Sequence, residues 1–221
     1  MKSMLKMLLT GSLIMAALWL LLFAPAGTLH YWQAWLFFGV LVLASWIASI
    51  YLLRTDPAML QRRMPASESR PVQKALIWGV YTCWIALVVV SSLDHRFGWS
   101  HVPVLISVLG YALVVGGIVG AALVFAQNSH AATTIRVEEN QPLISTGIYG
   151  IVRHPMYTAN TLLYFGTPLA LGSYWGLIFA IPAPVIFALR IHDEETLLQE
   201  ELAGYHSYMT KVPHRLVPLV W

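Results

Sequence analysis

Two groups of polar and charged side chains flank a long apolar segment in the second half of this chain. The residues RHPMY, beginning at Arg153, open the segment, and RIHDEETLL, beginning at Arg190, closes it. Between Arg153 and Arg190 the sequence contains no Asp, Glu, Lys or Arg. If this segment folds back on itself as a helical hairpin, both groups lie at the same end of the hairpin. Together they form a candidate reactive site at a membrane surface.

Helix geometry predicts how the residues of these two groups lie. Arg190 and Glu194 are four residues apart, so they lie on the same face of a continuing helix. His154 precedes Pro155, which is favoured at the first position of a helix, so we expect His154 at the beginning of one. The free backbone N–H groups at a helix N-terminus attract carboxylates and phosphates.

The composition predicts a membrane protein. Hydrophobic residues make up 58% of the 221 residues and charged residues only 10%, which is more apolar surface than a soluble core of this size can hide. A spanning helix needs about 20 apolar residues, and charge-free windows of that length recur along the chain. They predict an all-α integral membrane protein, a bundle of about five to six transmembrane helices with a C-terminal helical hairpin and an interfacial helix. The expected helices cover approximately residues 8–24, 32–53, 75–92, 103–126, 156–171 and 174–190.

Smaller features refine this arrangement. The last two helices are either short spanning helices or a hairpin that does not fully cross the bilayer, and Pro182 and Pro184 predict a kink in the second. Gly116, Gly117 and Gly120 predict a face for close helix packing. The loop 54–71 fits either an amphipathic segment on lipid headgroups or a plain solvated loop. The apolar residues of 195–209 recur at helical spacing, which predicts one helix that lies along the membrane and caps the site.

The distribution of basic residues predicts the orientation. If the N-terminus is cytoplasmic, Arg96 is the only one of the 13 Lys and Arg residues that falls outside. Basic residues are enriched in cytoplasmic loops. We therefore expect both termini, and both polar groups of the hairpin, on the cytoplasmic side.

Two segments of the chain resemble the isoprenylcysteine carboxyl methyltransferase (ICMT) family and its bacterial membrane-embedded relatives. The resemblance rests on LISTGIYGIVRHPMYTANTLLYFGTPLALGS in residues 143–173 and RIHDEETLLQEELAGYHSYMTKVPHRLVP in residues 190–218. This two-part pattern is far more specific than RHP alone. The first half of the chain matches only in being helical and apolar. Ala159 replaces a usual glycine and Ile148 a common proline, two mild departures that concern the geometry of the loop.

The resemblance implies a methyltransferase, embedded in the membrane, whose cofactor is S-adenosyl-L-methionine. It implies a single membrane domain over residues 1–221, with transmembrane helices in 1–126 and the cofactor-binding loop, hairpin and interfacial helix in 127–221. Arg190 matches the family arginine beside the substrate carboxylate, so the implied catalytic residues are Arg190 and Glu194. The implied cofactor-binding residues are Gln141, Pro142, Leu143, Ile144, Tyr149, His154, Pro155, Met156, Tyr157 and Glu194.

The expected reaction is methylation of the carboxylate of a lipidated (isoprenyl) cysteine or a similar lipophilic acceptor. A C-terminal carboxyl has an ordinary pKa near about 3.3, so it is ionised at neutral pH and needs no general base. The enzyme has to align two reactants and exclude water. A thiol or an amine is the alternative acceptor, and a base such as His154 or Glu195 would then be useful.

Two other classes of protein remain as alternatives. Sterol-type membrane reductases resemble the C-terminal part of this chain, which makes an NADPH-dependent reductase the alternative enzyme. A transporter or scaffold would require ionisable residues at mid-membrane or an internal repeat, and neither is apparent. His192, His206 and His214 lack the spacing of a metal site. The expected partners are a lipophilic or lipidated substrate and membrane lipids, with no nucleic acid and no obligate protein partner, in a bacterial inner membrane.

Overall fold

The computed structural model describes residues 2–55, 71–129, 141–218 and 220–221, and within these ranges it contains helices and turns but no strand. The helices in chain order are α1 (Lys2–Ala26), α2 (Trp32–Thr55), α4 (Pro71–Phe97), α5 (Val104–Gln127), the 3-10 helix η1 (Gly147–Gly150), α6 (Pro155–Ala170), α7 (Leu177–Ala180), α8 (Pro182–Glu201) and α9 (Tyr205–Lys211). The prediction of an all-α protein is confirmed. The two alternatives for the loop 54–71 fall mostly outside the described residues.

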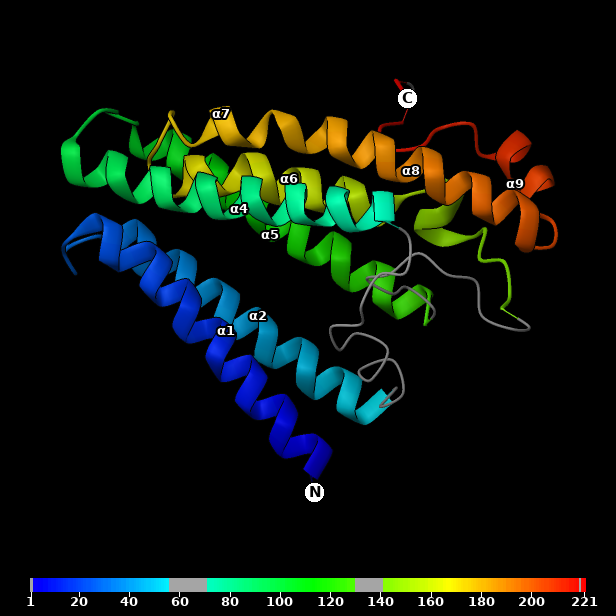
Figure 1. Ribbon diagram of the computed structural model, residues 1–221, viewed down its shortest axis with the longest axis horizontal. Helices are drawn as coiled ribbons and strands as arrows, with labels where there is room; N and C mark the ends of the chain where they lie inside the picture. The colour runs from blue at the N-terminus through cyan, green and yellow to red at the C-terminus, as the bar shows by residue number, and fades with distance from the viewer. Residues whose placement is uncertain (1, 56–70, 130–140, 219) are drawn as a thin grey trace.

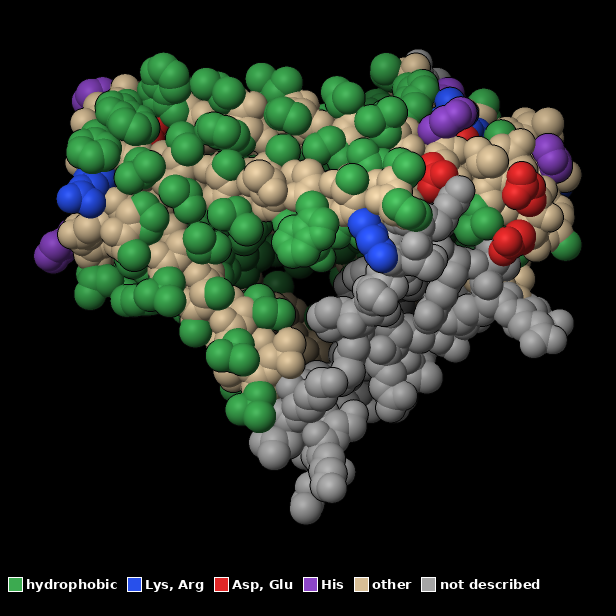
Figure 2. Space-filling view, viewed as in Figure 1, with side chains coloured by type: hydrophobic (Ala, Val, Ile, Leu, Met, Phe, Trp, Pro, Cys, Tyr) green, Lys and Arg blue, Asp and Glu red, His purple; other side chains and the backbone are tan. Residues whose placement is uncertain are grey.

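Among the described residues, four helices are long and apolar enough to cross a membrane: α1 from Leu9, α2 as far as Tyr51, and the whole of α4 and α5. Large apolar side chains stay exposed on them, and Leu43, Trp46 and Ile47 of α2 are each at least 60% exposed. Figure 2 shows apolar side chains over most of the visible face. Hydrocarbon solvates such a surface, whereas water does not. The chain is an integral membrane protein.

The predicted hairpin consists of α6 followed by α7 and α8. Its turn lies between Ala170 and Leu177, where the sequence predicted a break. α6 has 16 residues, fewer than a full span requires. Pro182 begins α8, so the predicted kink is a helix boundary between α7 and α8. Beyond Arg190, α8 continues to Glu201, which places the acidic cluster on a helix.

Glycine lets α5 and α6 approach each other closely. A Cβ atom on Gly117 would lie 2.7 Å from the Ala159 carbonyl oxygen and from Leu163 Cγ, closer than real Cβ contacts. The same atom on Gly116 would meet only Leu162, at 3.8 Å. The glycine face predicted from the sequence is confirmed at Gly117, while Gly116 points away from the close contact.

A buried network joins two turns at the end of the bundle away from α9. Asp94 accepts hydrogen bonds from Ser100 N and Ser100 Oγ, each at 2.6 Å, and from Ser173 Oγ at 2.5 Å. The Tyr31 hydroxyl donates to the Leu171 carbonyl at 2.7 Å. These bonds hold the α4–α5 turn against the α6–α7 turn. They fix the far end of the hairpin whose other end carries the candidate site.

The C-terminal region differs from the single helix predicted over 195–209. α8 ends at Glu201, and α9 begins at Tyr205 after Gly204, which has a φ of +84°. This left-handed conformation favours glycine, so the chain turns there although the apolar spacing continues. The turn packs Tyr205 and Tyr208 against Leu202 in a small apolar cluster. Figure 1 shows α9 at the end of α8, and α1 and α2 diverging from the other helices.

Candidate active site

Tyr157 joins the two groups of residues that flank the hairpin. Its hydroxyl donates to Glu194 Oε2 at 2.9 Å and accepts from Arg190 Nε at 3.3 Å. Arg190 and Glu194 are one turn apart on α8, as predicted, so one hydroxyl from α6 reaches both. Phe187 packs against the Tyr157 ring, with centroids 5.4 Å apart. The structure therefore assembles a cation, a hydroxyl and a carboxylate between α6 and α8.

Arg190 is a buried guanidinium with neutral partners. It is 6% exposed, and besides Tyr157 it donates from Nη1 to the main-chain carbonyl of Gln73 at 3.4 Å. The two acceptors of Arg190 among the described residues, the Tyr157 hydroxyl and the Gln73 carbonyl, are both uncharged. A buried charge is costly unless it is paired with an opposite charge. The arrangement is thus suited to receiving an anion beside Arg190.

His154 lies between the two glutamates at the beginning of α6. It is the N-cap residue, and Pro155 occupies the first turn, as predicted. Its Nε2 atom is 3.2 Å from Glu195 Oε1, and its Nδ1 atom is 3.9 Å from Glu194 Oε1. The imidazole is 5% exposed. These contacts fix the orientation of the ring next to the free N–H groups of the helix.

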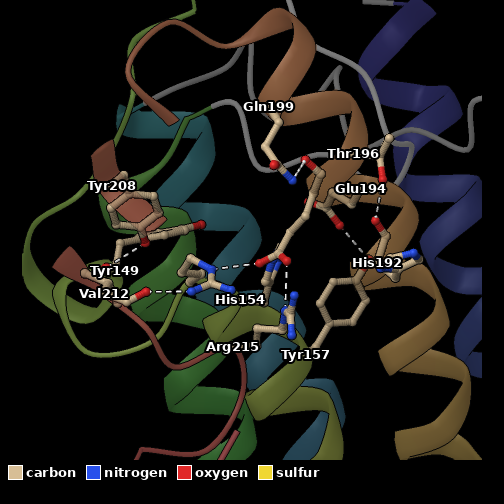
Figure 3. Close-up of polar contacts among 12 residues, drawn as sticks. Tyr149, His154, Tyr157, His192, Glu194, Thr196, Gln199, Tyr208, Val212 and Arg215 are labelled. Carbon is tan, nitrogen blue, oxygen red and sulfur yellow. Dashed lines mark hydrogen bonds and ion pairs between the residues drawn. The ribbon is translucent and has the colours of Figure 1, made fainter. Parts of the chain in front are cut away.

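Glu195 is a buried carboxylate surrounded by donors. Arg153 Nε lies 2.7 Å from Oε1, and Arg215 Nε lies 2.8 Å from Oε2. Burial alone would raise the pKa of Glu195, but hydrogen bonds from His154, Arg153 and Arg215 outweigh burial and lower the pKa to about 2. Figure 3 shows two of these partners, His154 at the beginning of α6 and Arg215 in the C-terminal segment, lying close together beside α8. Glu195 therefore stays ionised and connects three parts of the chain.

The C-terminal segment after α9 is bonded to the beginning of α6. Arg153 N donates to the His214 carbonyl at 2.9 Å, and His154 N donates to the Arg215 carbonyl at 3.0 Å. Arg153 Nη1 also donates to the Val212 carbonyl at 2.7 Å. Main-chain bonds of this kind hold the segment in one register beside His154. We call residues 212–216 the C-terminal strap.

η1 and α9 pack against each other on one side of the site, near Glu194. The Tyr208 hydroxyl donates to the Tyr149 carbonyl at 2.7 Å, and Asn128 Nδ2 donates to the Tyr149 hydroxyl at 3.1 Å. Burial raises the pKa of Tyr149 to about 12, with the Asn128 hydrogen bond opposing the shift and Glu194 adding to it. Leu143 packs against the apolar cluster of α9. Tyr149 and Leu143, both expected near the cofactor, thus lie against α9.

The remaining expected residues fall into two places. Pro155 and Met156 form the first turn of α6 between His154 and Tyr157. The segment 141–144 has no regular secondary structure, with Pro142 exposed and its three neighbours half-buried. Their contacts with a cofactor remain a prediction.

Sequence reasoning missed several residues that organise the site. Gln73 comes from α4, where its side chain is fully buried and donates to Asp193 Oδ2 at 2.5 Å. Arg153 and Arg215 were not expected to meet at Glu195. The available signals were a polar Gln73 at the start of an apolar helix and a charge directly before His154.

Comparison with known proteins places this geometry in a family context. Residues 105–203 match the phospholipid methyltransferase family, PEMT. The resemblance to membrane methyltransferases is confirmed over this part of the chain. The chain is 33% identical over 94 residues to the protein-S-isoprenylcysteine O-methyltransferase of Schizosaccharomyces pombe, a match that covers 42% of this chain and 39% of that protein.

A second relative matches a longer part of the chain at lower identity. It is the nickel-cobalt-cadmium resistance protein NccN of Alcaligenes xylosoxydans xylosoxydans, 21% identical over 140 residues, which cover 61% of this chain and 62% of that protein. The chain thus spans less than two thirds of the length of either relative. The family match includes α6 and the whole of α8 with its acidic residues, but ends before α9 and the C-terminal strap.

Proposed function

We propose that this protein is an S-adenosylmethionine-dependent methyltransferase of the membrane that methylates the carboxylate of a lipidated (isoprenyl) cysteine or a similar lipophilic acceptor. The family match and the named O-methyltransferase relative support methyl transfer. The exposed apolar helices support an acceptor that arrives from the bilayer. The site lies between the beginning of α6 and the second half of α8, so a lipid can stay in hydrocarbon while its polar end reaches Arg190.

The buried Arg190 guanidinium is the observation that carries this proposal. Its neutral partners, the Tyr157 hydroxyl and the Gln73 carbonyl, leave its charge available to an anionic acceptor. A carboxylate is the anion that the proposed reaction supplies, and guanidinium binds carboxylates in a planar, two-point geometry. Arg190 positions the nucleophile, and Tyr157 holds Arg190 in place.

The surroundings of Glu195 favour a carboxylate acceptor over a thiol or an amine. Glu195 has a pKa lowered to about 2 and is bonded to Arg153, His154 and Arg215, so it is a poor proton acceptor near neutral pH. A carboxylate needs no proton removed before it attacks. Glu195 acts instead by holding His154 and the C-terminal strap together.

The residues present fit the proposed cofactor. When bound, S-adenosylmethionine supplies an electrophilic methyl group on a sulfonium. Glu194 provides a negative charge that suits this cation, and the wall of Leu143, Tyr149 and α9 lies next to Glu194. His154, Pro155 and Met156 close the other side, at the beginning of α6. Gln141, Pro142 and Ile144 are the neighbours of Leu143 in the segment 141–144.

The proposal includes a bacterial inner membrane with both termini cytoplasmic. The described basic residues support this orientation, because Lys74, Arg153, Arg190 and Arg215 lie at the site end of the bundle, while Arg96 lies at the other. Cytoplasmic S-adenosylmethionine would then have access to the site.

The class of reaction can be tested with the detergent-purified protein. Calorimetry with S-adenosylhomocysteine should detect binding, and calorimetry with NADPH should not. Labelled methyl transfer to an S-farnesylated cysteine should give a product that releases methanol in base, because only an ester does so. A base-stable product would indicate methylation of the amine of the substrate, whose thiol is already alkylated, and binding of NADPH alone would indicate a reductase.

Substitution of Arg190 and Glu194 separates their roles. Arg190→Ala should lower turnover at saturating acceptor by about 10- to 100-fold, the usual scale for a hydrogen bond to a charged group, with little change in S-adenosylhomocysteine affinity. Glu194→Gln should weaken S-adenosylhomocysteine binding. Arg96→Ala, an exposed change at the other end of the bundle, is the control and should alter neither. Normal turnover in Arg190→Ala would rule out its role.

A further inference from the structure

Tyr205 is a buried tyrosine at the beginning of α9. It is 3% exposed, and its ring packs edge-on against Tyr208 with centroids 5.7 Å apart. Leu202 and Val212 complete the buried cluster, and Leu143 packs against it from the segment 141–144. The ring is therefore fixed by apolar contacts that do not involve its hydroxyl.

The hydroxyl of Tyr205 has no hydrogen-bond partner among the described residues. The neighbouring tyrosines differ in this respect, because Tyr208 donates to the Tyr149 carbonyl and Tyr157 donates to Glu194. Buried polar groups in folded proteins are nearly always hydrogen-bonded, and leaving one unpaired destabilises the protein. An apolar cluster would be equally well filled by phenylalanine. The hydroxyl thus calls for a partner that comes from outside the chain.

The surroundings of this hydroxyl place it on the cofactor side of the site. Burial raises the pKa of Tyr205, and the charges of Glu195 and Glu194 raise it further while Arg153 lowers it. The Tyr205 ring packs against Tyr208, which donates to the Tyr149 carbonyl, and Leu143 packs against the same cluster, so Tyr205 lies beside the wall of Leu143, Tyr149 and α9. Its hydroxyl also stays protonated near neutral pH, so it can donate as well as accept a hydrogen bond.

We propose that the Tyr205 hydroxyl hydrogen-bonds S-adenosylmethionine in the bound state, making Tyr205 a further cofactor-binding residue. This inference rests on the proposed function. Tyr205 lies just beyond residues 105–203, the part of the chain that matches the family model. The proposal also gives α9 a role, because the turn at Gly204 places the Tyr205 hydroxyl on the proposed cofactor side of the site.

The test compares two tyrosines that differ in whether their hydroxyl is bonded within the protein. Tyr205→Phe removes an unpaired hydroxyl, and Tyr31→Phe removes one that donates to the Leu171 carbonyl at the other end of the bundle. Both variants are purified in the same detergent as the full chain. Calorimetry gives the dissociation constant of S-adenosylhomocysteine, and thermal unfolding without ligand gives the midpoint temperature.

We expect opposite patterns in the two variants. Tyr205→Phe should weaken S-adenosylhomocysteine binding by about three- to tenfold, the scale of one hydrogen bond, with a midpoint equal to or above that of the wild type. Tyr31→Phe should lower the midpoint and leave the dissociation constant unchanged. Wild-type affinity in Tyr205→Phe, or a lowered midpoint without ligand, would overturn this inference alone. Failure of the wild type to bind S-adenosylhomocysteine would overturn the proposed function as well.

Discussion

The carboxylate of Glu195 holds the beginning of α6 and the C-terminal strap together. Arg153, one of its partners, is buried and bonded through Nε to Glu195 and through Nη1 to Val212. Removing one member of a buried ion pair leaves the other uncompensated, which typically costs 3–5 kcal/mol. We expect Glu195→Gln to lose on the order of 3 kcal/mol of unfolding free energy. Glu201→Gln, an exposed change on the same helix, should stay near the wild type.

The contribution of Glu195 to stability should depend on pH in a defined window. Its pKa is lowered from 4.5 to about 2 in the folded protein, so its ionised form stabilises the fold at any pH above 4.5. This stabilisation is lost as the pH falls from 4.5 to about 2. Thermal unfolding of the wild type and Glu195→Gln at a series of pH values should show a difference that closes over that window. A difference that persists at pH 2 would indicate a packing defect instead.

The contact between α5 and α6 is the element-scale feature that positions Tyr157. A Cβ atom on Gly117 would collide with the Ala159 carbonyl at 2.7 Å, and backbone cannot move aside as a flexible side chain does. Gly117→Ala should therefore displace α6, lower the unfolding midpoint and reduce methyl transfer by tenfold or more, about 1.4 kcal/mol in activation free energy. Turnover and thermal unfolding in detergent measure both effects.

Gly116 provides a matched control one residue away on the same helix. Its Cβ would make an ordinary contact with Leu162 at 3.8 Å, so Gly116→Ala gains helix propensity without a collision. We expect wild-type activity and an equal or higher midpoint. If both alanine variants behaved alike, close packing at Gly117 would not be what holds α6 in place.

The elements of this protein could be predicted from the sequence more completely than its site. Charge-free windows and breaks located the helices because the bilayer imposes a length and excludes charge. The spacing of Arg190 and Glu194 predicted a shared face because α8 continues past the membrane. The role of Gln73 could not be predicted, because Gln73 and Arg190 are 117 residues apart in the sequence. Their contact depends on how α4 packs against α8. The contact of Arg215 with Glu195 could not be predicted either, because the single helix expected over 195–209 is interrupted between Glu201 and Tyr205.

At the scale of the whole molecule, the bundle has two chemically different ends. One end carries the site, α9 and most of the acidic side chains visible in Figure 2. The other is closed by Asp94 and its hydrogen bonds with Ser100 and Ser173. The proposed topology assigns the first end to the cytoplasm, where a soluble cofactor is made, and lets the lipophilic acceptor approach through the bilayer. The proposed function therefore depends on orientation as well as on the site.

Accessibility of single cysteines can measure this orientation in cells. The chain has one native cysteine, Cys83, so a Cys83→Ala background carries His101→Cys or Lys211→Cys as the only thiol. Both positions are exposed, His101 in the α4–α5 turn and Lys211 at the end of α9. A membrane-impermeant maleimide should label His101→Cys in intact cells and Lys211→Cys only after the membrane is opened, because twelve of the 13 basic residues then lie inside. The reverse pattern would place the site outside, away from cytoplasmic S-adenosylmethionine, and would contradict the proposed function along with the orientation.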